Sequence, residues 1–378
     1  MKDIATHALA LHHALRGKIE ISLKMPIVSR SDLSLIYTPG VGAVSSAIAK
    51  DPRIAQEMTW RHNVVAVVSD GSAVLGLGNV GPLAALPVME GKCAIFKRFA
   101  GIDAVPIVLA TQEVDEIVRT VQVLEPSFGA IQLEDISAPR CFEIERRLSA
   151  SLNIPVMHDD QHGTAIVVLA GLENAMKVTK RRSKKIKIVL SGAGAAGTAI
   201  AHLLHAAGFL HVIVCDRGGA IWAGRTDLSD VKADLAAFTN SHHEKGRMCD
   251  VLRGADVFIG ISSAGLVTSA MVKSMAPHPI VFAMANPVPE IMPDEAHAAG
   301  AAVVATGRSD FPNQLNNALV YPGLFRGMLD HDVKNVTIAM KLRAAKALAS
   351  SMKKPTADRM IPSIFDRGLH AAIARSVR

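Results

Sequence analysis

Residues 186–197 read IKIVLSGAGAAG, and they combine two signals. The apolar, β-branched run at 186–190 predicts a buried strand, and the glycines that follow it form the pattern G-x-G-x-x-G. A helical pattern continues over 195–207, and a second apolar run at 212–215 leads into Asp216, 19 residues after the last glycine. This order is typical of a βαβ unit, in which backbone N–H groups at a helix N-terminus hold a pyrophosphate. We therefore predict a dinucleotide site here.

The residues expected to contact the dinucleotide follow from this unit. They are Gly192, Gly194, Ala195, Ala196, Gly197, Asp216 and Arg217. Asp216 would accept hydrogen bonds from the adenosine ribose and would repel a 2′-phosphate, which favours NAD. Arg217 could instead bind that phosphate and admit NADP. The residues alone leave both cofactors open.

Further along the chain, the strand pattern continues. Apolar runs at 257–261 and 280–285 fit buried parallel strands, each followed by small or turn-forming residues. In a doubly wound sheet, ligands bind beyond the carboxyl ends of the strands. We therefore expect Asn286 to face the cofactor crevice.

A second G-x-G-x-x-G, at Gly76, Gly78 and Gly81, lacks this context. Pro82 could begin a helix, but Pro87 is expected to interrupt it one turn later. No strand that ends in an acid follows at the required distance. We interpret this stretch as a segment whose glycines let the backbone approach closely and so shape a substrate cleft.

The length of 378 residues predicts about two domains. We expect an α/β fold with an N-terminal substrate domain over 1–158 and a doubly wound, Rossmann-type nucleotide domain over 159–315. C-terminal helices over 316–378 are expected to pack back onto the first domain, and the alanine-rich pattern at 336–351 fits an amphipathic helix. No apolar run is long enough to cross a bilayer, and the four cysteines lie far apart, so we expect a cytoplasmic protein with reduced thiols.

The net charge of +7 raises the question of a nucleic-acid partner. The densest basic run is KRRSKK at 180–185, which has no aromatic residue among its charges. We interpret it as a solvated segment between domains and predict neither a nucleic-acid nor a membrane partner. A modest positive charge also suits an enzyme that attracts small anions.

Two acidic pairs, Glu134-Asp135 and Asp159-Asp160, stand beside apolar runs. Most acidic pairs are solvated surface, but carboxylates at the ends of apolar strands are poor candidates for it. Adjacent carboxylates repel each other, and a shared cation relieves that repulsion. Oxygen ligands in this number suit Mg²⁺ or Mn²⁺ better than zinc. We therefore predict a divalent-metal site.

Candidates for proton transfer are Lys92 and the two tyrosines, Tyr37 and Tyr321. Lys92 stands in otherwise apolar surroundings, where desolvation would lower its pKa toward the range of a general base. A buried tyrosine is most often part of the core, so position alone does not identify an acid.

The sequence resembles the malic enzymes, specifically their compact bacterial type, over nearly its whole length. The most specific stretches are YTPGV at 37–41, LGLGN at 75–79, LEDI at 133–136 and HDDQHGT at 158–164. This resemblance implies oxidative decarboxylation of L-malate to pyruvate and CO₂, with NADP or NAD and with Mg²⁺ or Mn²⁺. It also implies a homodimer or homotetramer, and it favours NADP because compact members often use it.

The resemblance assigns roles residue by residue. Glu134, Asp135 and Asp160 match the metal ligands, Asp159 a substrate-side acid, Lys92 the general base, Tyr37 the general acid, Asn286 a cofactor contact, and Asn316 or Asn317 a substrate contact. Larger relatives place a substrate-binding arginine near the position of Ala73, and the compact type lacks it. The groups that bind the malate carboxylates are therefore not identified.

Two other functions compete with this interpretation. One is a metal-independent NAD(P) dehydrogenase of another small hydroxy acid. The other is a regulatory or nucleic-acid-binding protein built on an inactive nucleotide fold.

Overall fold

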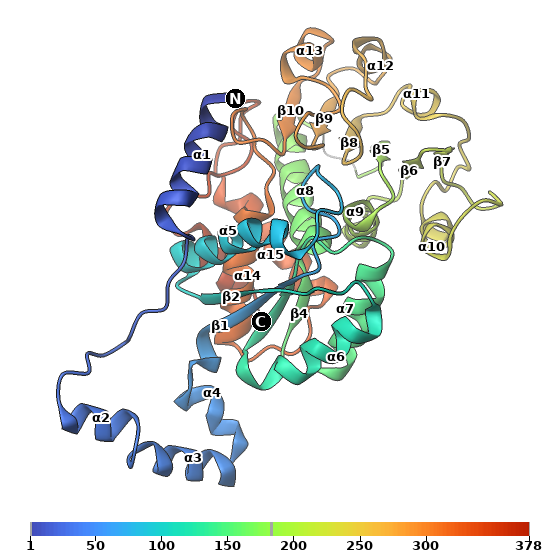
Figure 1. The fold of residues 1–378 in the computed structure, drawn as a ribbon. Coiled ribbons are helices and arrows are strands. Elements are labelled where there is room, and N and C mark those ends of the chain that lie inside the picture. The colour runs from blue at the N-terminus through green and yellow to red at the C-terminus, as the bar shows by residue number, and fades with distance from the viewer. Residues whose placement is uncertain (1, 182–183, 378) are drawn as a thin grey trace.

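The computed structural model describes residues 2–181 and 184–377, and it contains two mainly parallel sheets (Figure 1). The four-stranded sheet has the order β2-β1-β3-β4 and the six-stranded sheet the order β10-β9-β8-β5-β6-β7. The strands are β1 (Val64–Ser69), β2 (Asp103–Val108), β3 (Ala130–Leu133), β4 (Val156–His158), β5 (Ile188–Ser191), β6 (Val212–Asp216), β7 (Gly219–Ala220), β8 (Val257–Gly260), β9 (Ile280–Ala283) and β10 (Val303–Thr306). The α/β class and the doubly wound nucleotide sheet predicted from the sequence are confirmed.

Helices flank both sheets. In the first part of the chain they are α1 (Lys2–Leu15), α2 (Arg30–Ile36), α3 (Val41–Lys50), α4 (Ala55–Met58), α5 (Pro82–Ala100), α6 (Val114–Leu124) and α7 (Arg140–Ser151). The remainder has α8 (Asp159–Val178), α9 (Ala195–Ala206), α10 (Asp230–Phe238), α11 (Met248–Val251), α12 (Ser269–Lys273), α13 (Pro293–Ala298), α14 (Tyr321–Asp330), α15 (Ile338–Ser351) and α16 (Leu369–Ser376). Short 3₁₀ turns lie at η1 (Pro52–Ile54), η2 (Trp60–Asn63), η3 (Glu125–Ser127) and η4 (Asn317–Leu319).

The topology of the six-stranded sheet places a crevice next to β5. Ile188 in β5 pairs in parallel with Val212 in β6 on one side and with Val257 in β8 on the other. Because the strand order reverses between β5 and β8, the connections leave the sheet in opposite directions at this point. A ligand crevice forms at such a switch point, beyond the carboxyl ends of the strands.

Helix α8 joins the two halves of the chain, and its middle turns are buried. Side chains from β1 and β5, such as Val65 and Ile188, belong to one continuous apolar core that includes α8. Asn174 in α8 donates hydrogen bonds to the carbonyls of Ala349 (3.0 Å) and Met360 (2.9 Å), which ties the C-terminal segment to this helix. Helix α8 therefore connects the two sheets with the C-terminal segment.

The C-terminal helices return to the first part of the chain, as the sequence predicts. The rings of Tyr321 and Phe325 in α14 pack edge-on against Phe96 in α5, with centroid separations of 4.7 and 5.3 Å. Edge-to-face pairs of this kind add to the stabilisation from buried area. The domain limits at 158 and 315 remain predictions, because the apolar core runs through both parts.

Helix α5 corrects one expectation, since it runs through Pro87 without interruption. A proline inside a helix removes one N–H donor and leaves the carbonyl four residues earlier without its partner. That carbonyl belongs to Leu83, which is 82% exposed, so water can satisfy it. The buried face formed by Ala85, Met89 and Phe96 keeps the helix intact.

Residues 20–58, which we call the arm, extend away from both sheets and carry α2, α3 and α4 (Figure 1). All of these residues are described, and none is buried. The two ends of the arm are fixed to the body of the protein. Lys18 donates to the carbonyl of Pro87 (2.6 Å), and Arg61 forms an ion pair with Glu125 (2.9 Å).

The basic run at 180–185 is only partly described, because Arg182 and Ser183 lie outside the described residues. Within it, Arg181 is not simply solvated, since its guanidinium donates to the carbonyls of Pro277 (2.8 Å) and His278 (2.9 Å). Among the described residues, no helix has the length and apolar content that crossing a bilayer requires.

Candidate active site

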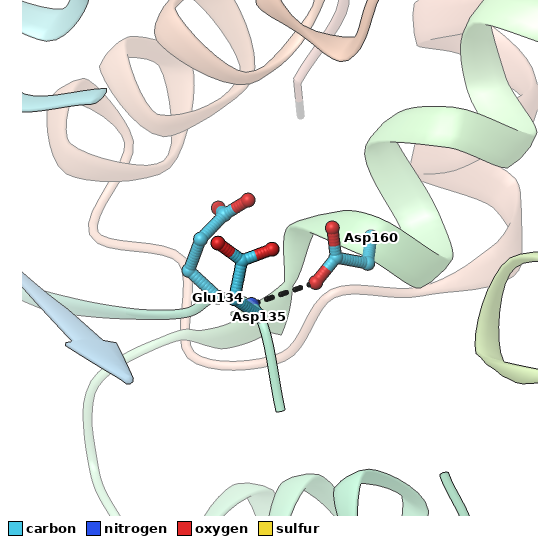
Figure 2. Close-up of side chains that lie close together, drawn as sticks. All are labelled: Glu134, Asp135 and Asp160. Carbon is cyan, nitrogen blue, oxygen red and sulfur yellow. Dashed lines mark hydrogen bonds between the residues drawn. The ribbon is translucent and has the colours of Figure 1, made fainter. Parts of the chain in front are cut away.

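Three carboxylates meet where β3 ends and α8 begins (Figure 2). Neighbouring residues of an extended strand point to opposite faces, but Asp135 has a left-handed φ of 55° that breaks this alternation. Its N–H donates to Asp160 Oδ2 over 2.8 Å. One oxygen from each of Glu134, Asp135 and Asp160 lies within 4.8 Å of the others.

The electrostatics of this cluster favour a cation. Burial, together with the neighbouring carboxylates, raises the pKa of Glu134 well above its usual value and that of Asp135 to about 7. Burial also opposes ionisation of Asp160, but the interactions with His158, with the charge of Lys92 and with the N–H of Asp135 together outweigh it and lower the pKa. The Asp135 Oδ2 atom is buried without a hydrogen-bond partner. A hard divalent cation would supply the missing partner and relieve the repulsion, so these residues fit the predicted metal.

Lys92 lies beside the cluster, on α5. Its Nζ is 2.8 Å from Glu134 Oε1, 2.7 Å from Asp159 Oδ2 and 3.2 Å from Asn317 Oδ1. The sequence predicts that desolvation lowers the pKa of Lys92, and this prediction is wrong for the metal-free arrangement. Burial does act in that direction, but the charges of Asp159 and Glu134 outweigh it and raise the pKa well above its usual value.

The predicted substrate-side residues also gather here. Asp159 is fully buried, and a Cβ at Gly163 would stand 2.0 Å from its Oδ1, so the helix can seat this carboxylate only with glycine at 163. Asn316 and Asn317 both line the cavity. The Asn316 side chain caps η4 by accepting from the N–H of Ala318 (2.8 Å), whereas Asn317 points its oxygen at Lys92.

A cavity of about 680 Å³ connects these groups to the nucleotide crevice. Lys92, Glu134 and Asp160 line one part of it, and Ala196, Ser262 and Asn286 line another. Such a volume lies in the range typical of small-molecule sites. The first glycine stretch shapes its wall, because a Cβ at Gly76 would stand 2.2 Å from the carbonyl oxygen of Asn286.

The three glycines of the nucleotide loop occupy distinct environments. Gly192 has a φ of 117°, and a Cβ at Gly197 would stand 2.0 Å from its carbonyl oxygen. A Cβ at Gly194 would meet nothing within 4 Å, which leaves open space at the N-terminus of α9. In this pattern, the first glycine allows a tight turn and the second lets a ligand approach the backbone closely. The third allows the helix to pack closely on the strand.

Asp216, at the end of β6, is already paired. Its carboxylate is 2.8 Å from Arg225 and 2.5 Å from Lys232. Burial opposes ionisation, but these two cations outweigh it and lower the pKa of Asp216. Arg217 is exposed beside it. The acid is therefore neutralised by partners within the chain.

Of the two predicted catalytic residues, the structure brings Lys92 to the cavity but not Tyr37. It lies on the arm between α2 and α3 and is 64% exposed. Tyr321, by contrast, lines the cavity, and its hydroxyl donates to the carbonyl of Lys92 over 3.3 Å. Its ring centroid lies 4.8 Å from Lys92 Nζ.

Sequence reasoning missed two acids that support the site, the partly buried Glu145 and the fully buried Glu290. Glu145 in α7 accepts hydrogen bonds from the His158 N–H (2.8 Å) and from the Gln161 side chain (3.0 Å), and it contacts His162 (3.0 Å). Glu290 accepts from the N–H groups of Ser262 (2.9 Å) and Ala285 (3.0 Å), so it holds the ends of β8 and β9 beside the crevice. Neither lies in a recognisable motif, and Glu145 stands among the charged residues of α7, so the local sequence gives no signal for its role.

The doubly wound sheet and the glycine turn at its switch point define a Rossmann-type dinucleotide-binding fold. The family model described as the malic enzyme N-terminal domain matches residues 16–114 and 110–149, and the model of the malic enzyme NAD-binding domain matches residues 161–377. The chain belongs to the malic enzyme family.

Individual relatives agree with this assignment. The chain is 53% identical to a bifunctional malic/malolactic enzyme of Bacillus subtilis, covering 99% of this chain and 92% of the relative. It is 52% identical to an NAD-dependent malic enzyme of Geobacillus stearothermophilus, over 99% and 78% of the two chains. The crystal structure of an NAD-dependent malic enzyme from Thermotoga maritima matches with a TM-score of 0.95 and 48% identity over 98% of both chains.

Proposed function

We propose that the chain catalyses the divalent-metal-dependent oxidative decarboxylation of L-malate to pyruvate and CO₂, with Lys92 as the general base and Tyr37 as the general acid. The observation that carries this proposal is the position of Lys92. Its amine lies between Glu134 and Asp159 on a cavity wall that faces the nucleotide crevice. A substrate in this cavity would lie within reach of the base, the metal ligands and the nicotinamide together.

Lys92 would accept the proton of the malate C2 hydroxyl as the C2 hydride passes to the nicotinamide. Asp159 and Asn317 would orient the amine, because both accept its hydrogen bonds. A divalent cation held by Glu134, Asp135 and Asp160 would polarise the substrate oxygen and stabilise the charge that develops as CO₂ leaves. With Glu134 engaged as a ligand, Lys92 loses one of the two carboxylates that keep its pKa high, which favours its neutral form.

Tyr37 would then protonate C3 of the resulting enolpyruvate. The competing candidate, Tyr321, is buried and already donates its hydroxyl hydrogen to the chain. Burial raises the pKa of Tyr321 well above its usual value, and it therefore suits a positioning role beneath Lys92. Replacing each tyrosine by phenylalanine distinguishes the two: we expect a large loss of kcat for Tyr37→Phe and a smaller one for Tyr321→Phe.

For the cofactor, we propose a preference for NADP. The arrangement around Asp216 supports it, because Arg225 and Lys232 neutralise the carboxylate that would otherwise repel a 2′-phosphate. Arg217 adds an exposed cation at the same strand end. Relatives of both kinds exist, since an NADP-dependent malic enzyme of Halomonas elongata is 46% identical over 94% of this chain. The ratio of kcat/KM with NADP to kcat/KM with NAD tests this preference. Arg217→Ser should lower that ratio, because it removes a cation that could bind the 2′-phosphate.

The proposal is tested by following the formation of NAD(P)H from L-malate with and without Mn²⁺. We expect no activity in excess EDTA and recovery when Mn²⁺ is restored. Lys92→Ala should lower kcat by on the order of 10²–10⁴, the usual contribution of general acid–base catalysis. Full activity in EDTA would instead support the metal-independent dehydrogenase, and near-normal turnover of Lys92→Ala would exclude the role given to that lysine.

A further inference from the structure

The active-site cavity contains few cations for a substrate with two negative charges. Of the described residues that line it, only Lys18 and Lys92 are basic. L-Malate brings two carboxylates to a wall that already holds Glu134, Asp135 and Asp160. A divalent cation offsets only part of this negative charge, and Lys92 must be neutral to accept a proton. Because a desolvated charge requires a partner, the substrate needs a further cation, and Lys18 is the remaining one on the cavity wall.

The position of Lys18 is fixed by helix α5. Gly17 has a φ of 118°, a conformation that favours glycine, and it directs the chain from α1 onto α5. The Lys18 N–H donates to Glu90 Oε2 over 3.2 Å, and its Nζ donates to the carbonyl of Pro87 over 2.6 Å. Both ends of this residue are therefore held by the stretch of α5 that directly precedes Lys92.

The amine of Lys18 keeps donors for a ligand. An ammonium group has three N–H donors, and the carbonyl of Pro87 accepts one of them. Within the described part of the chain, no carboxylate lies at ion-pair distance from this amine.

Gly91 leaves space beside the same amine. It lies in the interior of α5 and lines the cavity together with Lys18. The atom that an added Cβ at 91 would meet is Lys18 Nζ, at 3.7 Å. Glycine inside a helix is less stable than alanine. Its presence here keeps the cavity open next to the amine.

The chemistry of the reaction distinguishes the two carboxylates of malate. The C4 carboxylate leaves as CO₂, so its negative charge disappears in the transition state. A cation paired with it would stabilise bound malate more than the transition state and would slow the reaction. The C1 carboxylate keeps its charge from malate through to pyruvate. A cation paired with that group stabilises the substrate without opposing decarboxylation.

We propose that Lys18 binds the C1 carboxylate of malate and keeps this contact in pyruvate. The inference rests on the function proposed above and identifies the group that recognises the retained carboxylate. The Pro87 carbonyl would hold one donor of the amine, and the carboxylate would accept the others. Lys18 and Lys92, which reach the cavity at neighbouring positions along α5, would then contact C1 and the C2 hydroxyl of the same substrate.

Replacing Lys18 by methionine tests this contact, because methionine lacks the charge but has a similar length. In Lys18→Met, the KM for L-malate and the inhibition constant of pyruvate should both rise by about 10–100-fold, the usual contribution of a hydrogen bond to a charged group. The kcat at saturating malate and the KM for the cofactor should change little, since the contact is equal in the ground and transition states. Lys18→Arg keeps the charge and should recover most of the affinity.

The matched control is Lys97→Met, on the same helix. Lys97 pairs with Asp103 at 2.6 Å on the surface and is not among the described residues that line the cavity. This variant loses the same charge, and both constants should stay as in the wild type, because exposed pairs contribute little. An equal shift in the two variants would show that the overall charge, and not a contact of Lys18, attracts the substrate.

The remaining outcomes separate this inference from the proposed function. A rise in the KM for malate without a change in the pyruvate constant would place the amine on the leaving carboxylate and overturn the C1 assignment. A lower kcat with an unchanged KM would mean that Lys18 only ties the chain to Pro87. A wild type that forms no NAD(P)H from malate would overturn the proposed function, and this inference with it.

Discussion

Lys92 and its carboxylate neighbours show how strongly a side chain depends on groups distant in sequence. Its amine contacts Glu134 and Asp159, which stand 42 and 67 positions further along the chain. The apolar sequence around Lys92 correctly indicates burial, but it contains no information about these two partners. The sign of the pKa shift was therefore beyond a local interpretation.

Glycine at 163 is expected to be essential for the position of Asp159. In Gly163→Ala the new methyl group would stand 2.0 Å from Asp159 Oδ1, so the carboxylate must shift and its contact with Lys92 is disturbed. We expect a loss of kcat on the order of 10²-fold, as misplacement of a catalytic group by about 1 Å produces. Gly171→Ala, in the same helix, meets only the ends of flexible side chains, Leu315 at 2.9 Å and Met360 at 3.4 Å, and should stay active. Equal activity of the two variants would contradict this account.

Glu145 should affect the affinity for the metal indirectly, because it holds the backbone of His158 and the side chains of Gln161 and His162. Burial opposes its ionisation, but the charge and hydrogen bond of His162 outweigh this and lower the pKa of Glu145 to about 2. In Glu145→Gln, the new amide N–H group would face the N–H donors of His158 and Gln161, which now bind a carboxylate. We expect the loss of these hydrogen bonds to lower the affinity for Mn²⁺ by about 10–100-fold. Activity titrated with Mn²⁺ measures this change, with kcat at saturating metal largely retained.

The control for Glu145 lies on the same helix. Glu143 is half exposed and pairs with Arg147 at 3.2 Å on the surface. Glu143→Gln should leave the Mn²⁺ titration unchanged, because exposed pairs contribute little. A similar shift in both variants would show that α7 responds to lost charge in general.

At the scale of elements, the arm is expected to fold against a partner. Introducing charge with Leu33→Asp/Leu35→Asp should prevent packing, since these side chains are 49% and 68% exposed in the single chain. We predict a monomer in sedimentation, a loss of activity on the order of 10²-fold or more, and an unchanged helical spectrum for the body. Leu210→Asp, at a position that is 59% exposed on the nucleotide part, should have no effect on mass. A dimeric, active arm variant would contradict the prediction.

How well each element could be predicted depends on how local its causes are. The strand-glycine-helix unit at 186–216 was predictable, because φ of 117° at Gly192 and the contact at Gly197 are requirements of a few consecutive residues. Helix α5 was misjudged because its buried face outweighs the local effect of Pro87. The place of Tyr37 could not be predicted, since its motif identifies the residue but not the surface on which the arm packs.

At the scale of the whole molecule, His370 makes stability depend on pH. It lies in α16, and both of its ring nitrogens are buried without a hydrogen-bond partner. Burial lowers its pKa to about 4, below the ordinary value of 6.5. Between these values the unfolded chain binds a proton that the folded chain does not, so stability falls as the pH falls through this range. We expect about 2 kcal/mol of such loss between pH 7 and pH 5.

His370→Leu should remove this contribution. The difference in free energy of unfolding between variant and wild type, from urea titrations at the two pH values, should shift by about 2 kcal/mol in favour of the variant at the lower pH. His331→Leu, at an exposed position, controls for the loss of one histidine. A pH-independent difference for His370→Leu would show that its ring is protonated in the folded state.

An arm that buries nothing within its own chain also connects catalysis to the amount of protein present. By mass action, an arm that packs on a second copy is covered only in the associated fraction, so specific activity would fall on dilution below the dissociation constant of the dimer. Rate would then rise faster than linearly with enzyme concentration at the lowest concentrations. A cell producing little of this chain would obtain less activity from each molecule than a cell producing much of it.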